Sequence, residues 1–462
     1  MSDLDCCVVT FNCARELIDT SFFARSLHDA ISTSGDPPDL LVLALQEIAP
    51  IAYSFIGGSY LTPYFSRFED AIDQFMDIWR GTTIRYELVQ TLNVGMTGLM
   101  VFAQPDITRN FTRIETASVR VGDYELGNKG AAGIRIGYRP SSQDTDIPLT
   151  FIGAHLAPSE SAWERRNTDW ATIASNMIFS APSPSSSTSR PKPLSSPSTT
   201  SSTESQPLLS SSPSSSFLTH RTIYAPYPSS LLLLAGDLNY RTSDLRPHPE
   251  DHKTWPSPHH ANSNPQLPSS PFAPLLATDQ LLREVGKGRT FHGLTESKVT
   301  FPPTYKYSDA AQQAAGVSGQ AGAAGGAGSS EGADLDLDLK GTEGAWAKHR
   351  VPSWCDRILY RGRVKVGKYD ALPVQPSSDH RPVVLRFEVD VSETQQGEAE
   401  ELEGSPYRID PDWERRRERS RAKELGVGVL AYLVLTWEGR VLLLGTVVAV
   451  VGLGAVGRSW GW

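Results

Sequence analysis

The chain has 462 residues, which is long enough for two or three average domains or for one large α/β domain with insertions. Its 43 Lys and Arg residues against 52 Asp and Glu residues give a formal net charge of −9, which argues against general polyanion binding and against nucleic acid as a partner, so any basic site must be local. The four cysteines form no Cys-x-x-Cys pair, which disfavours a zinc site and a disulfide framework and fits a reducing compartment. The first residues carry acids and no basic segment before their apolar run, unlike a secretory signal.

Runs typical of β-strands alternate with runs typical of helices over residues 1–391. Two strand candidates, LLVLAL and LLLLAG, are continuously apolar, which indicates that both of their faces are buried. Two sheets packed on each other, with helices outside, would bury them in this way. In chain order we expect strands at 5–12, 40–47, 86–94, 99–103, 131–138, 149–155, 231–237, 357–360 and 383–391, and helices at 69–79, 159–178 and 275–284.

Two segments of low complexity interrupt this pattern. Residues 181–216 are rich in Ser, Pro and Thr, and residues 309–345 are rich in Gly and Ala. The first composition cannot bury enough apolar surface to order itself, and the second is typical of a flexible chain. Because candidate site motifs lie on both sides of each segment, we interpret both as insertions into a single domain of residues 1–391.

The C-terminal end is apolar. Residues 441–457 carry no charge over 17 residues, the lower limit for a helix that crosses a membrane, and a shorter apolar run at 425–437 precedes them. The segment WERRRERSRAK upstream holds six cations, whereas beyond residue 457 only Arg458 is charged, and this bias leaves the large N-terminal part in the cytosol. We therefore expect a charged linker at 392–424, with a basic segment next to the membrane, and a membrane anchor at 425–457 that crosses once or forms a hairpin.

Polar side chains stand where several predicted strands end or begin, which is where α/β folds build their sites. Carboxylates and an Asn without a Cys/His cluster are typical of a hard-cation site, so they favour Mg²⁺ over Zn²⁺. With a histidine beside it, such a site can hydrolyse a phosphate ester, because the metal polarises a phosphoryl oxygen, a carboxylate orients water and the histidine stabilises the developing charge. The residues in question are Asn12, Glu47, His155, Asp237, Asn239, Asp379 and His380.

The stretch KHRVPSWCDRILY places cations, then an aspartate, directly before a short strand. A surface loop with a salt bridge between Asp356 and Arg357 is one interpretation, and a binding site is the other. Cys355 is expected to be a packed neighbour of such a site, since hydrolysis by a metal and water needs no thiol nucleophile, and Trp354 is expected to pack.

Several motifs together resemble the signature of the inositol polyphosphate 5-phosphatases, of the endonuclease/exonuclease/phosphatase superfamily. GDLNYR, PTYKY, PSWCDRIL and SDHRPV carry the likeness, and TFN, LQE, GNKG and AHLAP follow the family's remaining motifs in the expected order over residues 4–390. With its apolar tail, the chain is similar to the small tail-anchored fungal phosphoinositide 5-phosphatases of the endoplasmic reticulum. The resemblance implies a four-layer α/β sandwich of two packed mixed sheets, to which the tail adds a C-terminal membrane helix.

The resemblance also implies a role for each matching residue. Glu47 is a Mg²⁺ ligand, Asn12 lies close to the metal, and Asp379 supports the metal or the neighbouring histidine. The catalytic set is Asp237, which orients or activates water, Asn239, which holds water or phosphate, His380 on the scissile phosphate, its partner Asp356, and His155 on the opposite wall. The substrate set is Lys348, Arg350, Tyr305 and Lys306 around the 4-phosphate, with Asn128 and Lys129 of GNKG as further contacts.

These features favour hydrolysis of the 5-phosphate of phosphatidylinositol 4,5-bisphosphate to give phosphatidylinositol 4-phosphate, at the endoplasmic reticulum and with no protein partner predicted. Soluble inositol polyphosphates are the alternative substrates. A nuclease is disfavoured by the acidic balance and by PTYKY and PSWCDRIL, and a sphingomyelinase-like phosphodiesterase by the cation cluster. A membrane-tethered scaffold that binds phosphoinositides without turnover would need a broken site, and none of the central motif residues is missing.

Overall fold

The computed structural model describes residues 3–32, 35–79, 84–141, 144–181, 221–224, 230–258, 270–324, 344–391 and 405–459. Most of the first predicted insertion (182–216), the second half of the other (325–343) and the start of the predicted linker (392–404) lie outside these residues.

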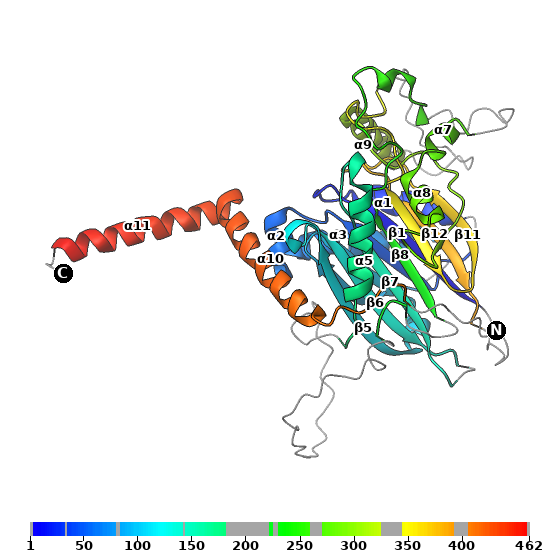
Figure 1. Ribbon diagram of the computed structural model, residues 1–462, viewed down its shortest axis with the longest axis horizontal. Helices are drawn as coiled ribbons and strands as arrows, with labels where there is room; N and C mark the ends of the chain where they lie inside the picture. Colours follow the sequence, from blue (N-terminus) through cyan, green and yellow to red (C-terminus); the bar gives the residue numbers. More distant parts are fainter. Residues whose placement is uncertain are drawn as a thin grey trace, which may run out of the picture.

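Two mixed sheets of six strands each form the centre of the molecule (Figure 1). Each sheet holds one parallel pair, β1 with β2 and β7 with β8, and its other pairs are antiparallel. The first sheet has the order β11 (Val364–Ala371), β12 (Val383–Val389), β1 (Leu4–Asn12), β2 (Leu40–Gln46), β4 (Thr97–Ala103) and β3 (Glu87–Val94). The second has the order β5 (Phe111–Val121), β6 (Lys129–Tyr138), β7 (Ile147–His155), β8 (Leu231–Asp237), β10 (Asp356–Arg361) and β9 (Thr295–Glu296).

Helices cover the outer face of each sheet, which confirms the layers expected of the sandwich. Helices α1 (Thr20–Ile31) and α3 (Thr62–Ile78) share one apolar cluster with the first sheet. Helices α5 (Trp163–Asn176) and α8 (Gln280–Gly286) share another with the second sheet. The shorter helical segments are α2 (Ile51–Ile56), α4 (Pro105–Thr108) and α7 (Ala273–Leu276), with 3-10 turns at Gly58–Leu61, Asp123–Glu125, Glu160–Ala162 and Asp251–Thr254.

The continuously apolar strands are buried on both faces because they divide their side chains between two cores. In β2, Leu40, Val42 and Ala44 face the core between the sheets, while Leu41, Leu43 and Leu45 face α1 and α3. Strand β8 alternates in the same way, with all seven residues buried. Alternation along a strand therefore explains why these runs need no polar positions.

Several elements differ from the expectation. Strands β5 and β11 and helix α1 were not anticipated. The two strands lack a continuous apolar run, because β5 mixes charged residues and Thr with apolar ones and β11 mixes charged residues and Gly with apolar ones. The helix expected at 275–284 is two helices, because the Asp279 side chain caps α8 by accepting a hydrogen bond from the Leu282 backbone N–H. The Gly/Ala-rich segment begins with helix α9 (Asp309–Ala324), whose Ala311 and Ala315 are buried in the central core, so its first part is not the flexible chain that its composition suggested.

The C-terminal residues form two helices, α10 (Trp413–Leu435) and α11 (Trp437–Ser459), and the boundary predicted at residue 424 falls inside α10. Helix α10 lies along α2 and β5, whereas α11 extends away from the body of the molecule (Figure 1). Among the described residues no single helix is long and apolar enough to cross a membrane. The pair Trp413–Leu435 and Trp437–Leu453 meets that standard together, with a bend of 85° between its helices.

The packing of α9 can be tested by placing a charge on its buried face. Ala311→Glu puts an unpaired carboxylate into the central core and should lower the melting temperature by several degrees, because burying an unpaired charge is costly. Ala310→Glu, on the neighbouring exposed position, is the matched control and should leave it unchanged. Equal melting temperatures for the two variants, measured by thermal unfolding, would show that α9 does not pack on the core.

Candidate active site

A cavity of about 370 Å³ lies where the carboxyl ends of β1, β2, β7 and β8 meet. The parallel pairs bring these ends together, because Asn12 is in register with Gln46 and His155 with Asp237. Glu47 and Asn239 follow their strands with φ values of 47° and 58°, a left-handed backbone that is rare outside glycine and is concentrated at functional sites. The predicted site residues that line the cavity are Asn12, Glu47, Lys129, His155, Asp237, Asn239, Tyr305, Lys306, Asp379 and His380.

Asp237, which is 1% exposed, is the most densely hydrogen-bonded carboxylate of the cavity. Its Oδ2 accepts a hydrogen bond from Asn12 Nδ2 at 2.9 Å and lies 3.2 Å from His155 Nε2, while its Oδ1 accepts one from the Asn239 backbone N–H at 3.1 Å. Burial alone would raise the pKa of Asp237, but the hydrogen bond from His155 and the charges of His380 and Lys129 hold that pKa well below its usual range. The carboxylate therefore stays ionised in a place from which water is almost excluded.

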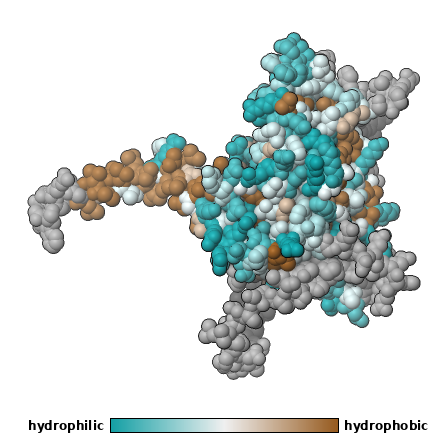
Figure 2. Space-filling model, viewed as in Figure 1, coloured by the Kyte–Doolittle hydropathy of each residue, from teal (hydrophilic) through white to brown (hydrophobic). Residues whose placement is uncertain are grey.

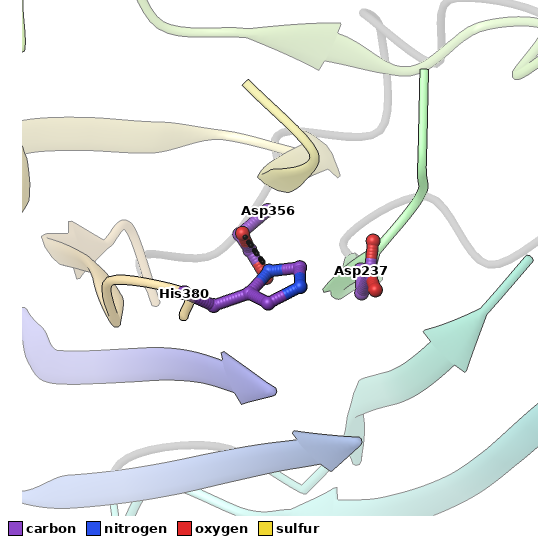
Figure 3. A group of neighbouring side chains, drawn as sticks. All are labelled: Asp237, Asp356 and His380. Carbon is purple, nitrogen blue, oxygen red and sulfur yellow. Dashed lines mark hydrogen bonds and ion pairs between the residues drawn. The ribbon is translucent and has the colours of Figure 1, made fainter. Parts of the chain in front are cut away.

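His380 and Asp356 form a buried pair beside Asp237. His380 Nδ1 lies 2.8 Å from Asp356 Oδ2, which also accepts a hydrogen bond from Thr304 Oγ1 at 2.7 Å. Burial lowers the pKa of His380, but the carboxylate of Asp356, with those of Asp237 and Asp379, raises it to about 9, so the imidazole is protonated at neutral pH. Figure 3 shows the ring held by Asp356 on one side and facing Asp237 with its other nitrogen.

His155 and Lys129 form the opposite wall. Lys129 Nζ contacts His155 Nε2 and lies 4.0 Å from Glu47 Oε1. Burial and the neighbouring Lys129 lower the pKa of His155, so that this histidine is neutral while His380 is charged. The two histidines of the cavity are thus held in different protonation states by their surroundings, an arrangement that suits acid–base and electrostatic roles.

The donors of the cavity fit a hard divalent cation. Among the described residues, Asp237, Asp356 and His380 bring their carboxylate and imidazole atoms within 4.8 Å of one another, but a protonated His380 cannot be a metal ligand. The predicted ligands Glu47, Asn12 and Asp379 line the same cavity, and their oxygen atoms are the ligands that Mg²⁺ and Ca²⁺ prefer. In the structure Glu47 Oε2 forms an ion pair with Arg15 Nε at 3.0 Å, and Asp379 is paired with Lys306.

Arg241 is a site residue for which sequence reasoning assigned no role. Its side chain is 3% exposed, lines the cavity and stacks over Tyr305 with 4.4 Å between the guanidinium carbon and the ring centre. Its Nε donates to the Asn239 carbonyl at 3.0 Å, while its Nη1 has no hydrogen-bond partner among the residues that the structure describes. A buried guanidinium with a donor to spare is suited to an anionic ligand. Arg241 is the last residue of the motif GDLNYR, so its place beside Asp237 and Asn239 in the sequence could have identified it as a site residue.

Other predicted contacts lie elsewhere. Lys348 is exposed, Arg350 Nη1 lies 3.6 Å from Glu160 Oε1, and neither lines the cavity, nor does Asn128. Asp356 is fully buried behind His380 and contacts its Nδ1 without lining the cavity. The cavity wall instead includes Arg15 and, from α9, Asp309 and Gln312. The Gly/Ala-rich composition of the segment that holds α9 did not predict that its first turn would line a site. Cys355 is buried and burial raises the pKa of its thiol, which agrees with a packing role.

The arrangement is equipped for hydrolysis of a phosphate ester. An ionised carboxylate, Asp237, can orient water by accepting a hydrogen bond from it. A protonated His380 and the buried Arg241 can stabilise negative charge on the oxygens of a phosphoryl group.

Comparisons with known proteins agree with this chemistry. The model of the Endonuclease/Exonuclease/phosphatase family 2 matches residues 9–319 and 340–386. The chain is 25% identical over 64% of its length to inositol-1,4,5-trisphosphate 5-phosphatase 1 of Schizosaccharomyces pombe, 24% over 77% to polyphosphatidylinositol phosphatase INP53 of Saccharomyces cerevisiae, and 24% over 67% to human phosphatidylinositol 3,4,5-trisphosphate 5-phosphatase 1. The matches span 19%, 24% and 20% of those relatives, respectively.

A solved structure shares the fold. The inositol polyphosphate 5-phosphatase domain of SPsynaptojanin, in complex with inositol (1,4)-bisphosphate and calcium ion, superposes with a TM-score of 0.52 over 92% of this chain and 90% of that one, at 21% identity. The two-sheet sandwich seen here is therefore the fold of that domain.

The protonated state of His380 leads us to predict how activity depends on pH. If the protonated imidazole stabilises the reacting phosphoryl group, activity should fall as the pH rises through about 9, the pKa of His380. Asp356→Asn removes the charge that does most to raise this pKa, so the alkaline fall should move to lower pH, with kcat reduced about 10²- to 10⁴-fold. The measurement is kcat against pH for both proteins. Asp370→Asn, at a half-buried position outside the cavity, is the control and should keep the wild-type profile. An unmoved alkaline limb in Asp356→Asn would contradict the assignment.

Proposed function

Since the chain belongs to the Endonuclease/Exonuclease/phosphatase family 2, we propose that it is a Mg²⁺-dependent phosphatase that removes the 5-phosphate of phosphatidylinositol 4,5-bisphosphate and leaves phosphatidylinositol 4-phosphate. The observation that carries this proposal is the buried Asp237 beside the His380–Asp356 pair, at a cavity that Arg241 also lines. The named relatives support the substrate class, because each is an inositol phosphate or phosphoinositide phosphatase.

In the proposed reaction, water attacks the phosphorus atom in line with the departing ring oxygen. Asp237 orients this water by accepting a hydrogen bond from it, with its own position held by Asn12, His155 and the Asn239 backbone, and the proton that the water loses passes to solvent. The His380 imidazolium binds a phosphoryl oxygen and stabilises the charge that develops there. The bond between phosphorus and the ring oxygen breaks, the ring oxygen takes up a proton from solvent, and the products are inorganic phosphate and the free ring hydroxyl.

Glu47 and Asn12 would hold the Mg²⁺, with Asp379 in support. The metal would supply Lewis-acid polarisation of the phosphoryl group, the usual contribution of Mg²⁺ to phosphate ester hydrolysis. Arg15 and Lys306, which pair with Glu47 and Asp379 in the structure, would then become available to the substrate.

A ring that carries more than one phosphate fits the cations of the cavity. Arg15, Lys129, Arg241 and Lys306 all line it, which is more positive charge than a single phosphate needs. Lys306 lies next to Tyr305, whose ring centre is 4.5 Å from that of His380, so a phosphate beside the scissile one would meet Lys306. This supports a 4,5-bisphosphorylated ring as the substrate.

The tail favours a lipid over a soluble inositol phosphate. Val441, Leu444, Val448 and Val451 on α11 are each more than half exposed, and Figure 2 shows α11 as a hydrophobic arm that extends from a largely polar body. Such a surface is unusual unless a membrane or a partner covers it. We propose that α11, with the end of α10, holds the protein at a membrane with its catalytic domain in the cytosol, and that this membrane is the endoplasmic reticulum.

The connection between the catalytic domain and α11 determines which membranes the active site can contact. The part of the tail before residue 424 packs on the domain. The Asp410 N–H donates to the Ser175 carbonyl at 3.0 Å, and Arg421 donates to the carbonyls of Phe55 and Ile56 at 2.9 and 3.1 Å. Only Thr436 separates α10 from α11. The described part of the predicted linker, residues 405–424, is therefore docked on the domain, and the joint between α10 and α11 is short. We propose that the enzyme acts on lipid in the membrane that anchors it.

The activity itself is tested with the full chain in mixed micelles that contain phosphatidylinositol 4,5-bisphosphate. Phosphate release should require Mg²⁺, stop in EDTA and fall by about 10²- to 10⁴-fold in Asp237→Asn and His380→Ala. Asp251→Asn, an acid outside the cavity, is the control. Soluble inositol 1,4,5-trisphosphate, assayed in parallel, decides between lipid and soluble substrates. A folded protein that binds the lipid without releasing phosphate would favour a scaffold and contradict the enzyme.

The docked joint predicts hydrolysis within one membrane. Full-length protein reconstituted in vesicles should hydrolyse phosphatidylinositol 4,5-bisphosphate present in the same vesicles and leave the lipid of separate, protein-free vesicles intact. A Gly/Ser linker of about 30 residues inserted after Thr436 should add hydrolysis in the separate vesicles, since a flexible chain of that length spans roughly 30 Å. Equal hydrolysis in both vesicle populations by the unmodified protein would overturn the prediction.

A further inference from the structure

Helix α10 brings a buried acid onto the catalytic domain. The Glu424 side chain is fully buried. Its Oε2 accepts a hydrogen bond from Arg120 Nε at 2.6 Å and lies 2.5 Å from Arg120 Nη2 and 3.1 Å from Arg421 Nη1. Arg120 is itself only 8% exposed, and burial lowers the pKa of its guanidinium. A complete ion pair taken out of water in this way stabilises a fold weakly, whereas removal of one partner leaves a buried charge unpaired, so the contact ties α10 to the arrangement of the domain seen here.

The Glu424 carboxylate packs against the turn at Gly127, two residues before Lys129. Gly127 has a φ of +82°, and a Cβ built there would lie 2.7 Å from Glu424 Oε1, so the turn rests directly on the carboxylate. From the other side, the Gly127 carbonyl accepts a hydrogen bond from the Met96 N–H at 3.1 Å. The turn is thus held between α10 and the β3–β4 hairpin.

A second contact on α10 holds the same segment two residues earlier. Ser420 Oγ donates to Glu125 Oε2 at 2.8 Å, and Arg416 Nη1 lies 3.3 Å from Glu125 Oε1. Glu125 has a φ of 55°, so this part of the chain is held in a conformation that it would not keep by itself.

The segment so held leads into the active site. Strand β6 begins at Lys129, and the register of β5 and β6 places Arg120 opposite Gly130, one residue further on. Lys129 Nζ contacts His155 and approaches Glu47, the two residues next to Asp237 and to the proposed metal. Gly127, which contacts α10, is therefore only two residues from Lys129, which contacts the active-site residues.

We propose that Glu424 is a positioning residue of the active site: through Arg120 and the Gly127 turn it holds Lys129 at the cavity. This inference rests on the proposed function for its effect on catalysis, but the contact itself does not. It makes α10 a part of the catalytic domain, so that the segment that joins the enzyme to its membrane also completes its active site.

The test is a double-mutant cycle between Glu424 and Lys129 in the full-length protein. Glu424→Gln should lower kcat/KM by about 10- to 100-fold, since small displacements of a positioning group are costly, with most of the loss in kcat. In a Lys129→Met background the same change should cost less than about twofold, because the group it positions is gone. Glu418→Gln, the same change at an exposed position of α10, should have no effect in either background. An equal loss from Glu424→Gln in both backgrounds would overturn the proposal.

Hydrogen exchange separates this inference from the proposed function. Amide exchange of residues 122–130 should be faster in Glu424→Gln than in the wild type and unchanged in Glu418→Gln, whether or not the protein hydrolyses an inositol phosphate. If the wild type releases no phosphate, the proposed function fails and the exchange rates alone decide on the contact. Where Glu424→Gln does not fold, Ser420→Ala, which removes only the hydrogen bond to Glu125, takes its place in both measurements. Unchanged exchange at 122–130 in a folded variant would overturn the proposal.

Discussion

A buried carboxylate that must stay ionised is the constraint on which this molecule depends. Asp237 is almost inaccessible to water, and desolvation of an isolated charge there would cost several kcal/mol. The surrounding residues offset that cost: Asn12 and the Asn239 backbone by hydrogen bonds, His155 by a third, and His380 by charge. The same charge of Asp237 helps to keep His380 protonated, so the two proposed catalytic groups stabilise each other in the states that the reaction requires.

The sandwich supplies these partners because of how its strands are paired. Parallel pairs β1–β2 and β7–β8 carry Asn12, Glu47, His155 and Asp237 to one edge, and the antiparallel strand β10 brings Asp356 into register with Asp237. Gly236 permits the close approach of β8 to β7, since a Cβ there would lie 2.0 Å from the Ala154 carbonyl oxygen. The site is therefore built on the ends of strands from both sheets, with Lys129 at the start of β6 and loops adding the other cations around it.

The sequence predicts the parts of this account that follow from local pattern. The apolar runs correctly predicted β2 and β8, and the polar residues at the ends of these strands correctly predicted the position of the cavity. Pattern could not locate β5, whose apolar residues are interspersed with Thr, Arg and Glu, nor α9, whose Ala-rich composition is shared by flexible chains. Lys348 and Arg350 lie outside the cavity and Arg241 inside it, because the direction of a side chain depends on loops whose course no periodicity encodes. The contact of Glu424 with Arg120 joins residues 304 apart, and only the folded chain brings them together.

The central claim is that the cavity hydrolyses a phosphate monoester on a ring whose other phosphate it spares. Identification of the products that the full-length protein forms from phosphatidylinositol 4,5-bisphosphate, by separation and mass spectrometry of lipid and water-soluble fractions, tests it most directly. The account predicts phosphatidylinositol 4-phosphate and inorganic phosphate. Phosphatidylinositol 5-phosphate would contradict the assignment of the scissile position, and diacylglycerol with inositol trisphosphate would contradict monoester hydrolysis itself.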